Sequence, residues 1–361
     1  MEQRVDAFGM LDLMVHPGFC VHDHKIIRVN PPAEALMITE GMDVTTILAT
    51  GKEEYAAFED GCLYLMLEAA CKKWGASVSC IGDYHVFILE QDADQSELQA
   101  MALAARELRE PLANIMTTAD RLFPMIALDA DPFTQEQVAR LNRGLFQMLR
   151  VIGNMSDAHR IESGFSSRQE TVDIRGLFEE VFVKAQELVE HTGLTLHYSG
   201  LDNSLFCLAD KETLERAALN ILSNAIKFTP KGGTIEVSLT RHGNQLRLSV
   251  QDSGSGIAEN LRNNIYSRYL RQPAIEDSRF GIGLGMVLIR SAATQHGGTV
   301  LIDHPQSKGT RVTMTMEIRQ NPTPLVRSGI FRVDYAGERD HSLIELSDCL
   351  PASVYDAKKV N

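Results

Sequence analysis

Residues 220–230 read Asn-Ile-Leu-Ser-Asn-Ala-Ile-Lys-Phe-Thr-Pro, and this stretch decides the fold of the C-terminal half of the chain. The apolar spacing predicts a helix that begins at Asp210 and runs through the stretch. Asn220, Asn224 and Lys227 stand at positions i, i+4 and i+7, so two carboxamides and an ammonium share one helix face. An amide oxygen is a hard ligand suited to Mg²⁺, and a lysine one turn further on can contact a phosphate.

Two glycine-rich turns follow this helix. The first, Asp252-Ser-Gly-Ser-Gly256, comes after a predicted hairpin of residues 234–239 and 246–250. An aspartate at the end of a buried strand can accept from an adenine amino group, while glycine lets the backbone pass close to the ring. The second turn, residues 280–285, places alternating glycines at the start of a helix, where bare N–H groups form an anion site. We therefore expect the phosphates of a nucleotide at the second turn.

The order of these elements resembles the N, G1 and G2 boxes of the sensor histidine kinase family, and the resemblance covers roughly residues 98–318. It implies an α/β-sandwich ATP-binding domain of the histidine-kinase (Bergerat) type, with ATP and Mg²⁺ as cofactors. In that family pattern Asn224 would hold Mg²⁺, Asp252 would read adenine and Lys227 would contact phosphate. The residues implied at the nucleotide are Asn220, Asn224, Lys227, Phe228, Asp252, Gly254, Gly256, Gly281, Gly283, Leu284 and Gly285.

The segment between the two glycine turns resembles the aromatic and basic lid of the same family. The resemblance is carried by residues 265–271, Ile-Tyr-Ser-Arg-Tyr-Leu-Arg. It implies that Arg268 or Arg271 approaches the γ-phosphate. A solvated basic loop is the alternative for either arginine.

Two helices with heptad spacing are expected before the ATP-binding domain. The first runs from about Asp94 to Phe123, just before Pro124, and the second opens at residues 134–137 with a capping box. The apolar heptad positions are Met101, Ala105, Leu108, Leu112, Ile115, Ala119 and Leu122 in the first helix and Val138, Leu141, Leu145, Met148, Ile152 and Met155 in the second. Because one antiparallel hairpin cannot cover both stripes, we expect a homodimeric four-helix bundle. A monomer whose N-terminal domain covers the stripe is the alternative.

Residues 105–112, Ala-Arg-Glu-Leu-Arg-Glu-Pro-Leu, resemble the phosphoacceptor box of the family, with Arg106 where the family has its histidine. Heptad phasing places Arg106 at a solvent-facing b position, and Pro111 should bend the helix beyond it. An imidazole offers a nitrogen lone pair near pH 7, whereas a guanidinium offers only donors. The resemblance leaves Glu107 at the base position. It puts Glu110 where the family usually has Thr or Asn, which can position a water for dephosphorylating the partner regulator. The usual phosphate acceptor and the usual phosphatase residue are therefore both replaced.

The chain is expected to be a multidomain α+β protein. The N-terminal region resembles a degenerate PAS sensor domain through the hairpin that ends in Val29-Asn30-Pro31, with an unrelated α+β docking domain as the alternative. We expect a helical stretch over residues 64–74 and a C-terminal hairpin that includes residues 342–346. The expected regions are the PAS-like domain (1–92), the dimerisation hairpin (93–165), the ATP-binding domain (166–320) and the C-terminal extension (321–361).

Composition limits the environment of the chain. A net charge of −13 over 361 residues argues against a nucleic-acid partner, because neutralising phosphates requires clustered Lys and Arg. The sequence has neither a membrane-length apolar run nor a signal-peptide pattern, so we expect a cytoplasmic protein with no membrane span. Its six scattered cysteines are expected to be free thiols.

The expected function is that of a histidine-kinase-like signalling protein that binds Mg-ATP but cannot autophosphorylate at its box. It would act as a degenerate kinase or conformational regulator on a response regulator or a partner kinase. The first alternative is an active kinase that phosphorylates a residue in trans or on a partner protein. The second is a scaffold that binds no nucleotide.

Overall fold

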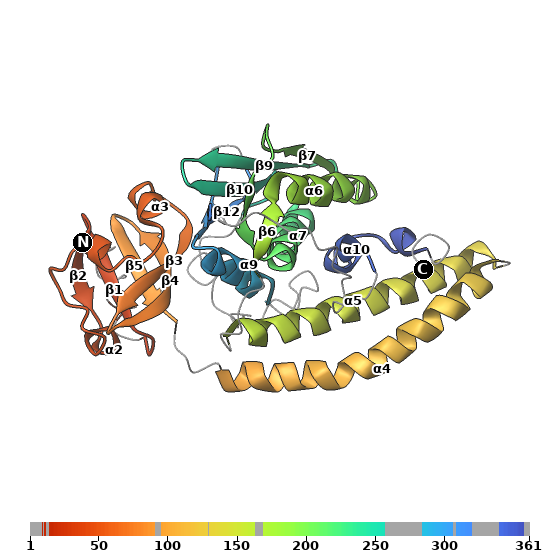
Figure 1. The fold of residues 1–361 in the computed structure, drawn as a ribbon, viewed down its shortest axis with the longest axis horizontal. Helices are drawn as coiled ribbons and strands as arrows, with labels where there is room; N and C mark the ends of the chain where they lie inside the picture. Colours follow the sequence, from red (N-terminus) through yellow and green to blue (C-terminus); the bar gives the residue numbers. More distant parts are fainter. Residues whose placement is uncertain are drawn as a thin grey trace.

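The computed structural model describes residues 14–90, 95–128, 130–162, 169–256, 284–305, 308–319 and 339–356, together with Gly9 and Leu11. Figure 1 shows an N-terminal sheet region in orange, a long antiparallel pair of helices, and a green and blue sandwich of sheet and helices above that pair. Within these described ranges, ten strands form one continuous sheet in the order β2-β1-β5-β4-β3-β11-β12-β10-β9-β7. No described helix is both long and apolar enough to cross a membrane.

The N-terminal region is an antiparallel sheet with short helices on it. Its core includes Phe19 and Phe87, whose rings stack with centroids 4.7 Å apart. The strands are β1 (Gly18–His22), β2 (Lys25–Val29), β3 (Cys62–Ala69), β4 (Lys72–Ile81) and β5 (Tyr84–Leu89). The short helices are α2 (Pro31–Glu34), η1 (Val44–Thr46) and α3 (Lys52–Ala56). A turn at Gly82-Asp83 joins β4 to β5, as the pairing of Ile81 with Tyr84 shows.

The helix expected over residues 64–74 is wrong, because this stretch forms the hairpin of β3 and β4. Leu63, Leu65 and Leu67 alternate along β3 and are all buried in the core. The strands turn at Ala70 and Cys71, whose φ angles of 50° and 59° lie in the left-handed region. A continuous apolar run has no period that separates a buried strand from a buried helix, so pairing across the sheet decided this element.

The N-terminal sheet joins the C-terminal domain through strand β11 (Val300–Asp303). Residues 62–64 of β3 pair antiparallel with residues 300–302 of β11. Beside this seam the guanidinium of Arg290 lies 4.7 Å from the ring centre of Tyr64 and pairs with Glu90. The two regions therefore share backbone hydrogen bonds as well as side-chain contacts.

The long helices are α4 (Gln95–Leu128) and α5 (Pro132–Glu162). The end expected before Pro124 is wrong, because α4 passes through this proline and buries Ala127 beyond it. Packing of the last turn therefore outweighs the backbone hydrogen bond that proline removes. The capping box expected at residues 134–137 is also displaced: Asp131 Oδ1 accepts from the Thr134 amide at 2.9 Å. Figure 1 shows α4 curving along its length, as a helix containing Pro111 is expected to do.

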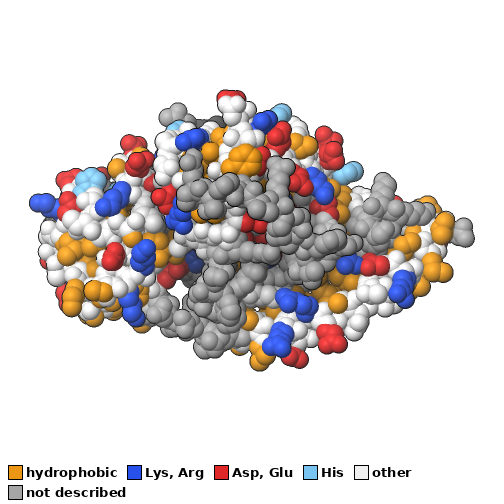
Figure 2. Space-filling model, viewed as in Figure 1, with side chains coloured by type: hydrophobic (Ala, Val, Ile, Leu, Met, Phe, Trp, Pro, Cys, Tyr) orange, Lys and Arg blue, Asp and Glu red, His pale blue; other side chains and the backbone are white. Residues whose placement is uncertain are grey.

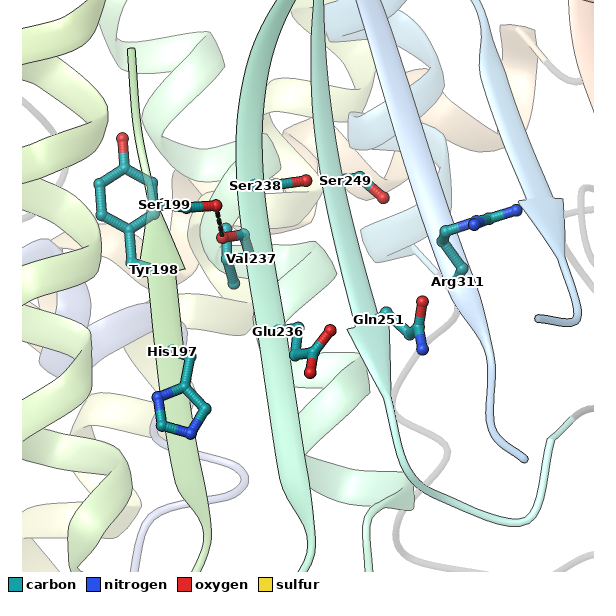
Figure 3. A pocket seen from close by; sticks show the side chains of 9 residues that line it. All are labelled: His197, Tyr198, Ser199, Glu236, Val237, Ser238, Ser249, Gln251 and Arg311. Carbon is teal, nitrogen blue, oxygen red and sulfur yellow. Dashed lines mark hydrogen bonds between the residues drawn. The ribbon is translucent and has the colours of Figure 1, made fainter. Parts of the chain in front are cut away.

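The C-terminal domain is a sheet with helices on one face (Figure 1). Its helices are α6 (Ile174–Glu190), α7 (Lys211–Phe228) and α9 (Leu284–Gln295). Besides β11, its main strands are β7 (Thr195–Ser199), β9 (Thr234–His242), β10 (Gln245–Asp252) and β12 (Arg311–Glu317), while β6 (Glu170–Asp173) pairs with β8 (Phe206–Ala209). Leu246, Leu248 and Val250 of β10 alternate into the core under the helices. The opposite face carries polar side chains such as Ser238 and Gln251 around a shallow pocket (Figure 3).

The described C-terminal segment forms α10 (His341–Glu345) and the short helix η3 (Ala352–Tyr355). The strand expected over residues 342–346 is therefore wrong. Asp340 caps α10 by accepting from the Ser342 amide at 2.9 Å, and Ile344, Leu346 and Tyr355 are buried in the C-terminal core. Contact with α5, α6 and α7 decided the conformation of this short segment.

Candidate nucleotide-binding site

The first turn of α7 is anchored to the end of α9. Asp210 Oδ1 accepts from the Thr213 amide at 3.1 Å, which caps α7 at the residue expected from the sequence. The Asp210 amide donates to His296 Nε2 at 3.0 Å, and the other ring nitrogen, Nδ1, donates to the Ala292 carbonyl at 2.7 Å. Burial lowers the pKa of His296, so its neutral form fits this arrangement. The imidazole therefore fixes the position of α7 against α9.

A second group of contacts surrounds Asp252 at the end of β10. Asp252 Oδ1 accepts from the amides of Gly254 at 2.8 Å and Thr310 at 3.2 Å. Burial raises the pKa of Asp252, and these two amide donors oppose the rise. Among the described residues both of these donors bond to Oδ1, so Oδ2 is the oxygen that can accept from a ligand. We call Asp252 with Gly254, Gly309 and Thr310 the Asp252 corner.

Close backbone approach makes glycine necessary at the Asp252 corner. A Cβ on Gly309 would lie 1.8 Å from the Asp252 carbonyl oxygen, and the φ of Gly309 is +116°. A Cβ on Gly254 would lie 2.4 Å from the carbonyl oxygen of Phe228, the last residue of α7. The first glycine turn therefore packs directly on the end of the Asn/Lys helix.

The side of α7 that carries Arg216, Asn220 and Lys227 faces the C-terminal segment, and we call it the Lys227 face. Lys227 Nζ donates to Asp348 Oδ2 at 3.0 Å, and Arg216 Nε donates to Glu345 Oε1 at 2.8 Å. Asn220 Nδ2 donates to the other oxygen of Glu345 at 3.2 Å. Each of the three α7 side chains thus contacts a carboxylate of the segment.

Helix α5 adds a cation to the same cluster. Arg150 donates to Asp348 Oδ2 at 2.5 Å and to Asn220 Oδ1 at 3.1 Å, and its Nε lies 3.4 Å from Glu345 Oε2. Burial alone would raise the pKa of Asp348, but the charges of Arg150 and Lys227 outweigh it and hold that pKa below its usual value. Asp348 is therefore ionised, and cations from two helices neutralise it.

The structure brings most of the expected nucleotide residues around α7. Gly285, at the start of α9, approaches Asn220 so closely that a Cβ on it would lie 3.0 Å from Asn220 Oδ1. A cavity of about 250 Å³ opens beside Lys227 and is also lined by Thr229, Lys231 and Asp348. The expected residues that fall within the described ranges are Asn220, Asn224, Lys227, Phe228, Asp252, Gly254, Gly256, Leu284 and Gly285. Arg268, Arg271, Gly281 and Gly283 lie outside the described residues.

The donors in the site suit a magnesium ion that is brought in by a nucleotide. In the described part of the chain, no cluster of three or more His, Cys, Asp or Glu side chains is placed to hold a metal. Asn224 is half-buried on α7, one turn before Phe228 at the Asp252 corner. One carboxamide supplies a single hard oxygen, so phosphate and water oxygens would have to complete the coordination of Mg²⁺.

Sequence reasoning missed the residues that occupy the Lys227 face. Arg150 lies 198 positions from Asp348, and Lys227 lies 121 positions from it. The only local signal was the acidic pattern of residues 345–348, Glu-Leu-Ser-Asp, in a tail that was expected to be a hairpin. Nothing in that pattern indicates which helix the acids contact.

Residues 105–112, the expected acceptor box, lie on α4. Ala105 is buried and Arg106 is exposed, as the heptad phasing predicts. Glu107 and Glu110 are also exposed. Arg109 crosses to α5, where its guanidinium donates to Ser156 Oγ at 3.0 Å. The position at which the resemblance places the acceptor is therefore open to solvent and carries a guanidinium.

Comparison with known proteins identifies the family. Residues 209–320, which contain α7, the Asp252 corner and α9, match the family described as histidine kinase-, DNA gyrase B- and HSP90-like ATPase. Hybrid signal transduction histidine kinase D of Dictyostelium discoideum is 28% identical over 240 residues, which cover 64% of this chain and 15% of that protein. The chain is a member of the histidine kinase family. The chain is a mixed α+β protein, and its residues 209–320 belong to an ATP-binding domain of the GHKL type, the class named for gyrase, HSP90 and histidine kinases.

Two further comparisons define how far the likeness extends. The signal transduction histidine-protein kinase/phosphatase MprB of Mycolicibacterium vanbaalenii is 29% identical over 233 residues, covering 63% of this kinase-family chain and 47% of that protein. The crystal structure of full-length ShkA in complex with AMPPNP has a TM-score of 0.50 at 21% identity, and covers 63% of this chain and 47% of that one. At this identity the likeness to ShkA shows the fold alone. The chain spans less than half the length of each of these three proteins.

Proposed function

We propose that this chain is a signal transduction protein of the histidine kinase family that binds Mg-ATP and does not phosphorylate itself at residues 105–112. The observation that carries the proposal is Arg106, which is exposed at the acceptor position of a chain whose residues 209–320 match an ATPase family. The cytoplasm is the proposed compartment, and a response regulator or partner kinase is the proposed target.

The Asp252 corner supports adenine binding. Its carboxylate is buried and held by two amides on one oxygen, so the other oxygen is available to accept from an exocyclic amino group. Asn224 would hold Mg²⁺ and Lys227 would contact phosphate, while the bound ion would neutralise phosphate charge. The AMPPNP in the ShkA complex is bound by that protein and supports the same expectation here.

The box supports a conformational output. A guanidinium has no lone pair with which to attack a γ-phosphate, and a carboxylate such as Glu107 is too weak a base to deprotonate it. Glu110 adds a negative charge where a phosphorylated aspartate of a partner would approach. We propose that nucleotide occupancy changes how the ATP-binding domain packs on the helical pair, and that the partner reads this change.

The helical pair supports a homodimer. Figure 2 shows hydrophobic side chains along the exposed surface of this pair. The exposed apolar residues of its two helices include Leu108, Ile115, Leu122, Leu141 and Met148, whereas Ala105, Leu112 and Ala119 are buried. One stripe of α4 is thus covered within the hairpin and the other is left for a second copy, which would form the proposed four-helix bundle.

Binding of a fluorescent ATP analogue with Mg²⁺ tests the proposal. We expect saturable binding that depends on Mg²⁺ and weakens about 5-fold to 150-fold in Asp252→Asn, because an amide donor would then face the adenine amino donor. Asp202→Asn, on an exposed loop of the same domain, is the matched control and should bind as the wild type does. Equal binding by the wild type and Asp252→Asn would overturn the adenine assignment.

Transfer of the γ-phosphate tests the second half of the proposal. Incubation with radiolabelled Mg-ATP should leave no acid-labile label on residues 105–112 of the wild type. Arg106→His should introduce such a label because it restores a nitrogen nucleophile. Acid-labile label on the wild-type box would contradict the proposal.

The contacts of the Lys227 face favour one second candidate, a scaffold that binds no nucleotide. Lys227 and Asn220 already contact Asp348 and Glu345. If those contacts were permanent, the phosphate side of the site would stay closed. The same titration decides, since a scaffold gives no Mg²⁺-dependent signal in any variant.

A further inference from the structure

The C-terminal segment, residues 339–356, lies between α5 and the ATP-binding domain. Figure 1 shows α10 in blue above α5 and beside α7, and α10 contacts α5, α6 and α7. Its start is tied to the neighbouring helices by Lys184 of α6, which pairs with Asp340 at 2.8 Å, and by Arg339, which pairs with Asp120 of α4. The segment therefore bridges the helical pair and the ATP-binding domain.

The segment is anchored to α5 mainly by contacts that do not involve the nucleotide site. Asn142 Nδ2 donates to the Tyr355 carbonyl at 3.0 Å, and the rings of Phe146 and Tyr355 pack edge to face at 5.2 Å. Arg143 donates to the carbonyls of Ser347 at 2.9 Å and Asp348 at 3.0 Å. These contacts would survive the loss of the contacts to α7.

The segment meets α7 through charge. Glu345 is fully buried between Arg216 and Arg150, and Asp348 lies between Lys227 and Arg150. Lys227 is the residue proposed to contact phosphate, so a carboxylate already stands where that ammonium would meet a negatively charged group. The first anion that pairs with a buried cation provides most of the electrostatic stabilisation. A second anion adds little, because the charge of the cation is already neutralised.

We infer that residues 339–356 act as an intramolecular competitor of Mg-ATP, in which Asp348 and Glu345 take the cations and the amide of α7 that a triphosphate requires. This inference rests on the proposed function. Contact of the segment with the Lys227 face and full engagement of a triphosphate exclude each other. Occupancy by Mg-ATP therefore loosens the segment from α7, and with it the part of the α7–α5 contact that runs through the segment.

Asp348 is the point at which the competition acts. Its side chain is 28% exposed, whereas Glu345 is 0% exposed, so a phosphate reaches the Lys227–Asp348 pair before the buried pair. The cavity beside this pair is also lined by Lys231, which supplies a further cation for the incoming anion. The anchor at Tyr355 keeps the released segment close, which favours its return when nucleotide leaves.

Asp348→Asn in the full chain tests the inference by titration with the fluorescent ATP analogue and Mg²⁺. This substitution keeps the size of the side chain and removes its charge, so we expect binding at least about fivefold tighter than in the wild type. Asp202→Asn is the matched control for loss of a negative charge and should leave the affinity unchanged. A thermal melt verifies that each variant is folded.

Hydrogen exchange on the wild type gives a second measurement that needs no variant. Saturation with Mg-AMPPNP should speed exchange of the backbone amides of residues 342–350, and Asp252→Asn at the same nucleotide concentration should reduce the effect. The competition is overturned, and the proposed function stands, if the wild type binds nucleotide but both readouts are negative. In that case Asp348→Asn binds nucleotide as the wild type does, and nucleotide does not speed hydrogen exchange in the segment. If neither the wild type nor Asp348→Asn binds nucleotide, the proposed function itself fails and the inference falls with it.

Discussion

The Asp252 corner packs on the end of helix α7, and the Lys227 face is one side of the same helix. The residues that complete the two sites come from different parts of the chain. The corner is completed by Gly254, Gly309 and Thr310, all inside the matched ATPase region of residues 209–320. The Lys227 face is completed by Arg150 and Asp348, both outside that region. The corner therefore follows from the domain alone, whereas the face depends on how this chain packs its other parts on the domain.

The two places also differ in electrostatics. Asp252 is held by neutral amides, and burial raises its pKa. Asp348 is half-buried, but the charges of Arg150 and Lys227 bring its pKa below the usual value. The carboxylate at the corner still has an oxygen to offer to a ligand, while the carboxylates at the face are already matched by cations. This difference predicts that the Asp252 corner can accept an adenine without rearrangement. The Lys227 face must first lose its contacts with the carboxylates of the C-terminal segment before it can accept phosphates.

Breaking the Lys227 face should have the largest effect on stability. Glu345→Ala leaves Arg216 and Arg150 without their buried carboxylate, and breaking such a pair costs about 3–5 kcal/mol of unfolding free energy. Urea unfolding of the full chain measures the loss. Glu136→Ala, which removes an exposed pair with Arg140 on α5, should change stability by less than about 0.5 kcal/mol. A loss below about 1 kcal/mol for Glu345→Ala would show that the face is not held by this pair.

Breaking the Asp252 corner should have the next largest effect. Gly309→Ala places a Cβ against the Asp252 carbonyl oxygen at a φ of +116°, and we expect a loss of about 2–3 kcal/mol together with weaker nucleotide binding. Gly243→Ala is the matched control because its φ is +58° and nothing lies within 4 Å of its Cβ, so only about 1 kcal/mol should be lost. Equal losses in the two variants would mean that the corner tolerates the extra carbon.

The smallest effect on stability concerns His296, which fixes the position of α7 and so supports both the Asp252 corner and the Lys227 face. Since burial lowers its pKa from 6.5, the native state favours the neutral ring. The contribution of His296 is therefore present above pH 6.5 and lost as the pH falls through its lower native pKa, with a slope of at most about 1.4 kcal/mol per pH unit. His296→Gln should remove this component when urea unfolding is compared between pH 7.5 and pH 5. An unchanged difference between these two pH values would contradict the assignment.

Local spacing predicted the elements that stay within one part of the chain. Asp210 caps α7, the predicted hairpin becomes β9 and β10, and Asp252 ends a buried strand. These features depend on caps, turns and side-chain periods over a few residues, which the sequence displays directly. The position of Arg106 on the exposed side of α4 follows from the same kind of local rule.

Local spacing failed where packing at a distance chose the conformation. Residues 64–74 form a strand pair because β3 is bonded to both β4 and β11. Residues 342–346 lie in and after a short helix because their apolar side chains fill the space between α5 and α7. Helix α4 continues through Pro124 because Ala127 is buried. In each case burial outweighed a weak local preference.

The sequence by itself determined which chemical groups this protein has: an aspartate followed by glycines, an Asn and Lys helix, and an arginine where the family resemblance leads one to expect a histidine. The tertiary structure alone decided that β3 extends the sheet of the ATP-binding domain and that Glu345 and Asp348 lie on the Lys227 face. The reason is physical. Residue types and short spacings are properties of neighbours along the chain, whereas contacts across 121 or 198 residues form only when folding buries the charges together.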